Sequence, residues 1–214
     1  MRIIKTSLLA GLMAASSFAT AQTAKLGAGN VGITAFSATF VGETITLNET
    51  WGASGPGSVI FRGLVTGTNY TVVKNITNNI GNSWTSFANE LLPNGPGVPG
   101  QPGLIPFGFQ PSDQSDGLSF AQASGLPRTS SFFPTLFVDE SAGRDYIDFG
   151  GGIWAAVAVG SMTFGLRTAA LTQPFLLFQR PNERTNVIPV PAALPLLLSG
   201  LGIFAFLARR RKNA

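Results

Sequence analysis

Carboxylates are the residues of this chain with the greatest capacity for chemistry, because its 214 residues include neither His nor Cys. Without these two residue types the chain lacks the commonest general base and the commonest zinc ligand, and it cannot assemble a Ser-His-Asp or Cys-His nucleophile system. The acids that stand close together in the sequence are Asp113 and Asp116 in SDQSDGL, and Asp139, Glu140, Asp145 and Asp148 in VDESAGRDYIDF.

These acids suggest two kinds of chemistry, calcium binding and glycoside hydrolysis. Calcium accepts carboxylates from loops that contain Gly, which makes Asp113, Asp116, Asp139 and Glu140 the calcium candidates. However, the alternating ligand spacing of an EF-hand is absent, and Asp before Gly is ordinary turn chemistry. Two carboxylates suffice in principle for a glycosidase, yet any chain with ten acids contains many such pairs. We therefore expect neither an enzyme nor a cofactor, and calcium binding stays an alternative.

The three tryptophans, Trp51, Trp84 and Trp154, are candidates either for the core or for stacking on sugar rings. Large aromatic side chains in a sandwich-like domain are more often buried than exposed. We expect all three to lie in the core, and sugar stacking would require them to be exposed in a groove.

The positive charge of the chain belongs to its ends. The formal net charge is +4, but six of the fourteen cations lie at residues 2, 5 and 209–212. Residues 22–188 keep eight cations against ten acids, a net charge of −2, and these cations form no stripe. Nucleic acid is therefore not an expected partner.

The first 21 residues have the pattern of a secretory signal peptide. Arg2 and Lys5 precede an apolar run over residues 8–18, and Ala19-Thr20-Ala21 follows as a cleavage signal. An N-terminal membrane anchor is the alternative, but the run is short for the ~30 Å thickness of a bilayer core. We expect cleavage after Ala21.

The last residues have the pattern of a membrane span with a basic tip. Residues 192–208 carry no charge, and as a helix they would be about 25 Å long, at the short end for a span. The cations Arg209, Arg210, Arg211 and Lys212 follow at once, and cations next to a span stay cytoplasmic. A buried core helix is the alternative, although such a helix does not normally end in four cations.

Proline residues mark the segment before this apolar run. Pro189, Pro191 and Pro195 each disfavour a helix at the residue before them, so residues 187–191 should be extended and open to a protease. Pro189-Val190-Pro191, the apolar run AALPLLLSGLGIFAFLA and the tip RRRK together resemble a PEP-CTERM sorting signal over residues 187–212. Most members of that family carry Glu at the middle position, whereas Val190 is closer to their VPLPA-like variants.

The resemblance implies a sorting pathway. Its partner would be an exosortase, a membrane cysteine peptidase, in a Gram-negative bacterium that makes exopolysaccharide and forms biofilm. The stretch NITNNIGNSWTSFANEL is also similar to a segment of other exported PEP-CTERM proteins. It brings no known catalytic residue to this chain.

The body of the chain reads as β-strands separated by Gly, Asn and Pro. ETITLNET and SMTFGLR alternate apolar and polar residues with period two. Further expected strands are VGITAFSATF, SVIFRGLV, NYTVVKNIT, WTSFANELL, GLSFAQ, PTLFVD, RDYIDF, IWAAVAV and PFLLFQR. This spacing predicts an all-β fold over residues 22–186, a single antiparallel sandwich of about ten strands, followed by one transmembrane helix at 192–208.

Two connections are notable. Gly67 in VTGTNYTVV is placed for the turn of a hairpin. Residues 93–117 are rich in Pro and Gly, which predicts a long surface loop, with a domain linker as the alternative. Within this loop, residues 94–112 should add little to the core.

Together these signals predict an exported structural or adhesive protein. It would cross the inner membrane, be held there briefly with its C-terminus in the cytoplasm, and end at the cell surface or in the extracellular matrix. The alternatives are a polysaccharide-binding module of the exopolysaccharide matrix, an unprocessed single-pass anchored protein, and a hydrolase with two carboxylates in a pocket.

Overall fold

The computed structural model describes residues 21–95, 108–112, 116–121, 125–141, 144–168 and 174–184. These ranges contain eleven β-strands and no α-helix. Nothing in the described part of the chain is a helix with the length and hydropathy needed to cross a membrane. The helix expected at 192–208 and the basic tip at 209–212 lie outside these ranges.

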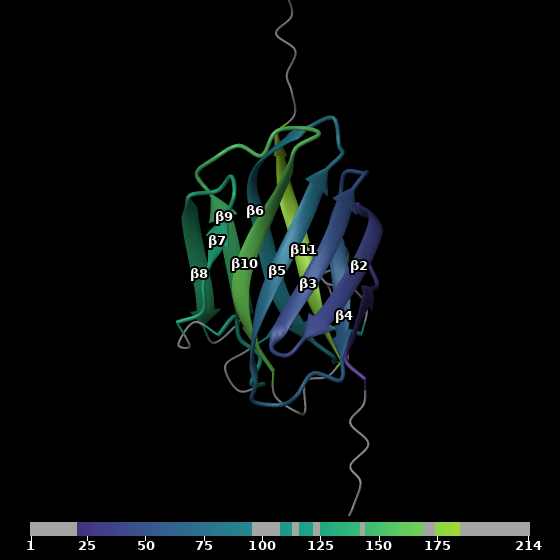
Figure 1. Ribbon diagram of the computed structural model, residues 1–214, viewed down its shortest axis with the longest axis vertical. Helices are drawn as coiled ribbons and strands as arrows, with labels where there is room; N and C mark the ends of the chain where they lie inside the picture. Colours follow the sequence, from purple (N-terminus) through teal and green to yellow (C-terminus); the bar gives the residue numbers. More distant parts are fainter. Residues whose placement is uncertain are drawn as a thin grey trace, which may run out of the picture.

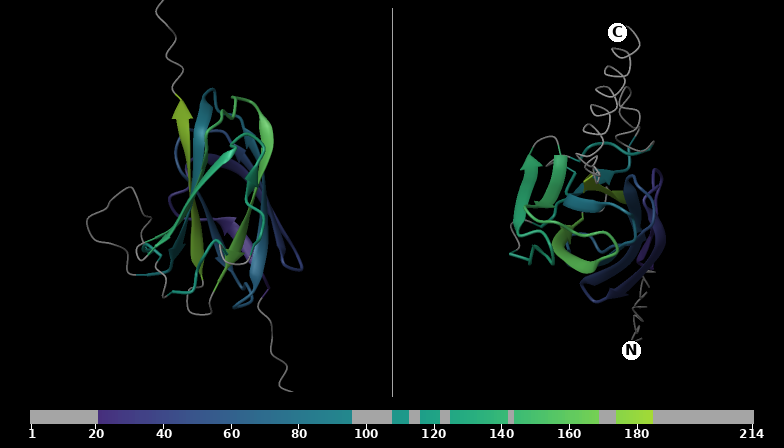
Figure 2. Two further views of the ribbon diagram at one scale, coloured as in Figure 1. Left: turned by 90° about the vertical axis from the view of Figure 1, so that its left-hand side faces the viewer. Right: turned by 90° about the horizontal axis from the view of Figure 1, so that it is seen from above.

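The strands form two sheets that face each other as in a β-sandwich (Figure 1). The six-stranded sheet has the order β1 (Thr23–Leu26), β4 (Gly57–Arg62), β11 (Phe175–Arg184), β6 (Ser83–Pro93), β9 (Arg144–Gly150) and β8 (Thr135–Ser141). The five-stranded sheet has the order β2 (Ile33–Val41), β3 (Thr44–Trp51), β5 (Asn69–Asn78), β10 (Val159–Arg167) and β7 (Thr129–Ser130). Figure 2 shows the two layers edge-on.

Strand pairing departs from the expected antiparallel pattern at one place. β3 and β5 run parallel, with Leu47 opposite Lys74 and Glu49 opposite Ile76. The other strand pairs of the described residues are antiparallel. Parallel neighbours need a crossover connection, and here the chain crosses to the six-stranded sheet to form β4 before it returns as β5.

This crossover corrects the hairpin expected around Gly67. Gly67 is in a turn, with φ at 76°, and its amide donates to the Thr168 carbonyl at 2.8 Å. The strands on either side of it, β4 and β5, belong to different sheets, so the turn joins two layers and not two paired strands. The positive φ value explains why Gly suits this position.

The core lies between the sheets and is built from alternating residues. In β5, Tyr70, Val72 and Ile76 are buried while Thr71 and Thr77 are partly exposed. Such alternation turns one face of each strand toward the opposite sheet. The expectation of an all-β fold built from half-buried strands is confirmed.

The tryptophans form the centre of one end of this core. Trp51, Trp84 and Trp154 are all fully buried. The Trp51 and Trp84 rings meet edge-on, with their centroids 5.6 Å apart. The Trp84 and Trp154 rings are tilted relative to each other, also with centroids 5.6 Å apart. The expected core position of all three is therefore confirmed, and none of them is exposed for stacking on a sugar.

Several expected strands are replaced by single contacts. IWAAVAV contributes the bridge between Trp154 and Trp84, a turn in which Val157 has a φ of 62°, and Val159 as the first residue of β10. GLSFAQ contributes only the bridge between Ser119 and Arg167. Conversely, the short strands β1 and β7 were not expected from the sequence, because neither has room for a full alternation.

The Pro/Gly-rich segment is anchored at its second end. Phe109 is only 7% exposed and packs with Leu92, Leu176 and Phe178 on the outer face of the six-stranded sheet. The Gly95 amide donates to the Gly108 carbonyl at 3.0 Å, which extends the pairing beyond β6. The expectation that residues 94–112 add little to the core is therefore wrong for Phe109.

Candidate functional site

The most unusual feature of the core is a charged pair at its centre. Glu49 on β3 and Lys74 on β5 occupy inward positions, because their neighbours at i±2 are buried core residues. Both side chains are fully enclosed, and Lys74 Nζ lies 3.4 Å from Glu49 Oε2. Charged groups are almost never fully buried unless they are paired, and this pair satisfies that condition.

Two carboxamides from the opposite sheet complete the cluster. Asn89 on β6 and Gln179 on β11 face each other in the strand register, and both are fully buried. Lys74 Nζ donates to Asn89 Oδ1 at 3.3 Å and also to Gln179 Oε1. We call Glu49, Lys74, Asn89 and Gln179 the core polar cluster.

Hydrogen bonds and aromatic rings hold Glu49 and Lys74 in place. Gln179 Nε2 donates to Glu49 Oε1 at 3.0 Å, and Trp51 Nε1 donates to Glu49 Oε2 at 3.1 Å. Lys74 Nζ lies 4.3 Å from the centroid of the Phe87 ring, a cation–π distance. Asn89 Nδ2 is the one polar atom of the cluster that has no hydrogen-bond partner among the described residues.

Burial changes the acid–base behaviour of Lys74. Removal of the ammonium from water lowers its pKa from 10.5 to about 8, although the charge and the hydrogen bond of Glu49 act in the opposite direction. A lysine with such a pKa exists in part as the neutral amine near pH 7. The neutral amine is a nucleophile, so the core polar cluster combines a nucleophile, a carboxyl group and two carboxamides.

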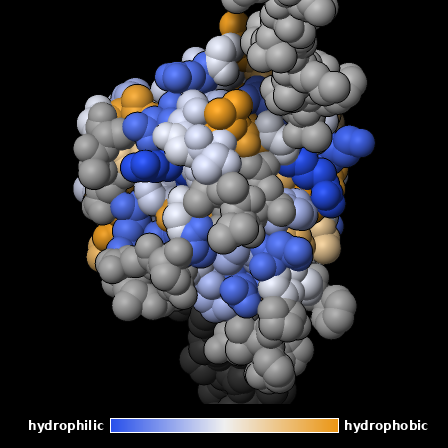
Figure 3. Space-filling view, turned by 90° about the horizontal axis from the view of Figure 1, so that it is seen from below, coloured by the Kyte–Doolittle hydropathy of each residue, from blue (hydrophilic) through white to orange (hydrophobic). Residues whose placement is uncertain are grey.

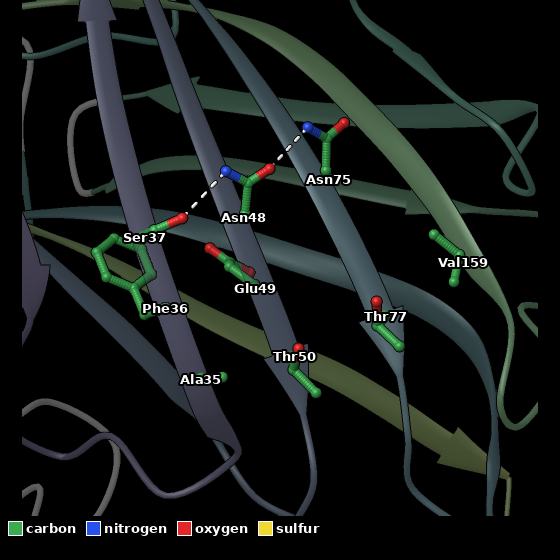
Figure 4. A pocket seen from close by; sticks show the side chains of 9 residues that line it. All are labelled: Ala35, Phe36, Ser37, Asn48, Glu49, Thr50, Asn75, Thr77 and Val159. Atoms are coloured by element: carbon green, nitrogen blue, oxygen red, sulfur yellow. Dashed lines mark hydrogen bonds between the residues drawn. The ribbon is translucent and has the colours of Figure 1, made fainter.

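A second candidate site lies on the outer face of the five-stranded sheet. A groove of about 360 Å³ is lined by side chains from β2, β3 and β5 and by Val159 (Figure 4). Asn75 Nδ2 donates to Asn48 Oδ1 at 2.9 Å, and Asn48 Nδ2 donates to Ser37 Oγ at 3.1 Å. These bonds form a row of polar groups that crosses three strands.

The surface offers no continuous apolar patch at the end shown in Figure 3. Hydrophobic residues there lie singly or in small groups among hydrophilic ones, over the part of the surface that is coloured. The groove on the outer face of the five-stranded sheet is the candidate binding surface that we consider further.

Two of the expected calcium candidates, Asp116 and Glu140, accept hydrogen bonds from protein groups. Asp116 accepts hydrogen bonds from Ser112 Oγ and from the Leu118 amide, each at 2.7 Å, and Glu140 accepts one from the Phe120 amide at 2.6 Å. Asp139 pairs with Tyr146 in the register of β8 and β9, and Asp113 lies outside the described residues. The described residues contain no group of three acids that could hold a metal ion.

The other two acids of that region take different roles. Asp145 is buried and lies within hydrogen-bond reach of Ser112 Oγ. Asp148 is half-buried on β9, and desolvation raises its pKa despite hydrogen bonds from Ser86, Tyr146 and the Phe87 amide. The side chains of Asp145 and Asp148 point to opposite faces of β9, so these two acids do not form a pair.

The targeting residues fall largely outside the described part of the chain. This holds for Ala19, for Pro189, Val190 and Pro191, and for Arg209, Arg210, Arg211 and Lys212. Ala21 is described and exposed, two residues before β1. The structure therefore leaves the sorting signal and the signal peptide as predictions.

Sequence reasoning missed the core polar cluster, although one signal for it was present. In YTVVKNI the period-two alternation of β5 places Lys74 in phase with Tyr70, Val72 and Ile76. Charged residues usually face solvent, so a lysine in the apolar phase of a strand was the clue. Comparison with protein-family models, with curated proteins and with solved structures finds no match to this chain.

Proposed function

We propose that this chain is an exported structural or adhesive protein of the cell surface or extracellular matrix, sorted at its C-terminus by an exosortase-type peptidase. One observation carries the proposal. Pro189-Val190-Pro191, an uncharged run and four cations occur in that order over residues 187–212. The N-terminal export pattern and the absence of Cys and His agree with a protein whose role is mechanical and not catalytic.

The arrangement of strands is compatible with removal of this segment. The last strand of the described residues, β11, ends at Arg184 and pairs with both β4 and β6. Cleavage near residue 189 would therefore leave every paired strand intact. The released domain would keep both sheets and the core between them.

Processing is tested in the producing cells with two variants. Replacing Pro189 and Pro191 by Ala removes the extended segment, and this variant should stay in the membrane with its full C-terminus. Pro102→Ala, in the Pro/Gly-rich segment, is the matched control and should be processed like the wild type. Fractionation and mass analysis of the C-terminal peptide provide the readout. Equal processing of all three proteins would show that Pro189-Val190-Pro191 is not the signal that is read, whereas a full C-terminus in the wild type as well would favour an unprocessed single-pass anchor.

The outer face of the five-stranded sheet favours a second function, binding of a neutral polysaccharide. Three rows of the strand register present outward residues without any charge: Ser37, Asn48, Asn75 and Ser161; Thr39, Thr46, Val73 and Thr163; Ala35, Thr50, Thr77 and Val159. Hydroxyl and amide groups bind sugar hydroxyls through hydrogen bonds.

This second function does not use the tryptophans, and it is tested on the sheet face itself. Binding of the purified domain to the matrix polysaccharide should weaken in an Asn48→Ala, Asn75→Ala double variant. Phe137→Ala, at an exposed position of the six-stranded sheet, is the control. If the double variant binds as well as the control, this face is not the binding site.

A further inference from the structure

The core polar cluster places a nucleophile against a carboxamide in a sealed space. Lys74 reaches from β5 across the core to β6 and β11, where its Nζ contacts both carboxamide oxygens. All four side chains of the cluster belong to residues that are at most 2% exposed. The reacting groups are therefore held together without competing bulk water.

The carboxylate of Glu49 lies between the amine nitrogen of Lys74 and the amide nitrogen of Gln179. Its Oε2 is 3.4 Å from Lys74 Nζ, and its Oε1 is 3.0 Å from Gln179 Nε2. Lys74 Nζ in turn contacts Gln179 Oε1. The three side chains thus form a closed ring of contacts that includes an amine, a carbonyl group, an amide nitrogen and a carboxyl group.

We propose that Lys74 and Gln179 become joined by an amide bond between Lys74 Nζ and Gln179 Cδ, with release of ammonia and with Glu49 as the acid–base group. The bond would link β5 of the five-stranded sheet to β11 of the six-stranded sheet. It is independent of how the C-terminus is sorted.

The reaction balances within the cluster and needs no added reagent. Glu49 first takes one proton from the Lys74 ammonium, which leaves a neutral amine and a carboxylic acid. The amine lone pair forms the bond to Gln179 Cδ, and the carbonyl electron pair moves to Oε1. Glu49 gives its proton to Nε2 and takes one from Nζ, the electron pair on Oε1 re-forms the carbonyl group as the Cδ–Nε2 bond breaks, and ammonia leaves with the electron pair of that bond. The products are a neutral amide, ammonia and protonated Glu49.

Two properties of the site favour this reaction. A pKa of about 8 for Lys74 leaves roughly a tenth of the amine neutral at pH 7, which is enough for a slow single turnover. The product also replaces a buried ammonium by a neutral amide, so it relieves the cost of keeping that charge out of water. The chain has no Cys, so this bond would supply the covalent link that exported domains often obtain from disulfides.

Asn89 provides a built-in comparison. Its Oδ1 also contacts Lys74 Nζ, and its Nδ2 has no partner among the described residues. No contact joins Glu49 to Asn89 Nδ2, so this leaving group lacks the proton donor that Gln179 Nε2 has. The contacts therefore select Gln179 over Asn89 as the acceptor.

Tryptic mapping of the denatured full-length protein separates these possibilities. Lys74 is the only Lys or Arg between Arg62 and Arg128, and Gln179 lies in the peptide 168–184, because Arg180 is followed by Pro. A link to Gln179 gives peptide 63–128, uncut at Lys74, joined to 168–184. A link to Asn89 gives 63–128 alone with an internal bond, and a free lysine gives 63–74 and 75–128.

The expected result is the joined pair 63–128 and 168–184, lighter than the sum of its parts by one ammonia. The wild-type protein alone decides the matter. Recovery of free 63–74 in full yield overturns the proposal, and an internal link to Asn89 overturns the assignment to Gln179. Intact mass is not sufficient, because cleavage after Ala21 would leave Gln22 at the N-terminus, where it can cyclise with the same loss of ammonia.

Variants test the role of Glu49. Glu49→Gln keeps the shape of the side chain but cannot relay a proton, so the joined peptides should be lost while the protein stays folded by circular dichroism. Asn89→Ser removes the competing carboxamide and should keep the link in full. Joined peptides in folded Glu49→Gln at the wild-type yield would show that Glu49 is not the acid–base group.

Discussion

Gln179 and Glu49 stand 130 residues apart in sequence and on opposite sheets, yet Gln179 Nε2 donates to Glu49 Oε1 at 3.0 Å in the middle of the core. This hydrogen bond and the contacts of Lys74 with Asn89 and Gln179 are the polar links of the core polar cluster between the inner faces of the two sheets. They fix how the sheets are positioned relative to each other, because each buried group depends on a partner from the other layer.

The charged pair should show strong coupling in stability measurements. Glu49→Leu, in which the Lys74–Gln179 link proposed above would not form, leaves the Lys74 ammonium buried without its carboxylate, and breaking a buried pair in this way costs about 3–5 kcal/mol relative to the unlinked ion pair. Adding Lys74→Met removes the stranded charge, so the double variant should be more stable than Glu49→Leu alone. Urea unfolding of residues 22–186 measures both. A double variant that is no more stable than the single one would contradict a charged Lys74 in the unlinked chain.

The longer strands were largely predictable because each of them carries its own signal. The alternation in ETITLNET and NYTVVKNIT depends only on which face of a strand is buried. The partner of each strand was not predictable, since period two says nothing about which neighbour supplies the hydrogen bonds. The parallel pairing of β3 with β5, and the change of sheet at Gly67, follow from long-range packing.

The error at IWAAVAV has a different origin. The run is apolar throughout, which suits a fully buried strand, but Ile153 and Val157 are 53% and 71% exposed. Trp154 points into the core, and the segment is held by its bridge to Trp84 and by hydrogen bonds from Asn78 to the carbonyls of Ala155 and Ala158. The core polar cluster escaped prediction because a rule based on average burial assigns Lys and Glu to the surface.

The raised pKa of Asp148 predicts how stability depends on pH. Because burial makes this carboxyl bind its proton more tightly in the folded chain, stability should fall as pH rises from 3.8 through the raised pKa. Asp148→Asn removes that loss, so the variant should be more stable than wild type at pH 7, and the difference should shrink on acidification. Glu43→Gln, at an exposed position, is the control for unfolding in urea at several pH values. A constant difference across the pH range would be inconsistent with this carboxyl.

Core packing predicts a contrast between two phenylalanines. Phe164 on β10 is fully buried and meets the Phe120 ring edge-on, with centroids 5.5 Å apart. Phe164→Ala should cost about 3–5 kcal/mol, because it leaves a cavity as well as losing buried area. Phe137 is 62% exposed, and Phe137→Ala should change the free energy of unfolding by no more than about 0.5 kcal/mol. Similar losses for both variants would mean that the inner and outer faces have been misassigned.

Calcium should not stabilise the domain. Asp116 and Glu140 already accept hydrogen bonds from protein groups, and a ligand raises the melting temperature only when it binds the folded state. We expect the melting temperature in millimolar Ca²⁺ to equal that in NaCl of the same ionic strength. A clear rise that is smaller in Asp113→Asn or Asp139→Asn would establish a calcium site in this region.

The Pro/Gly-rich segment should be removable between its anchors but not at them. The Gly95 amide meets the Gly108 carbonyl at 3.0 Å and the Gln110 amide meets the Pro93 carbonyl at 3.1 Å, so the two ends already stand as neighbouring strands do. Replacing residues 96–107 by Asn-Gly would close them with a two-residue turn, and loop closure entropy changes by only about 0.6 kcal/mol per doubling of length. We therefore expect little change in the free energy of unfolding. Phe109→Ala, in contrast, should cost about 3–5 kcal/mol, because it empties the cluster with Leu92, Leu176 and Phe178. Urea unfolding of the two variants beside the wild type decides the point: a domain that unfolds on loop replacement while tolerating Phe109→Ala would show that residues 96–107 contribute to the core and that Phe109 does not.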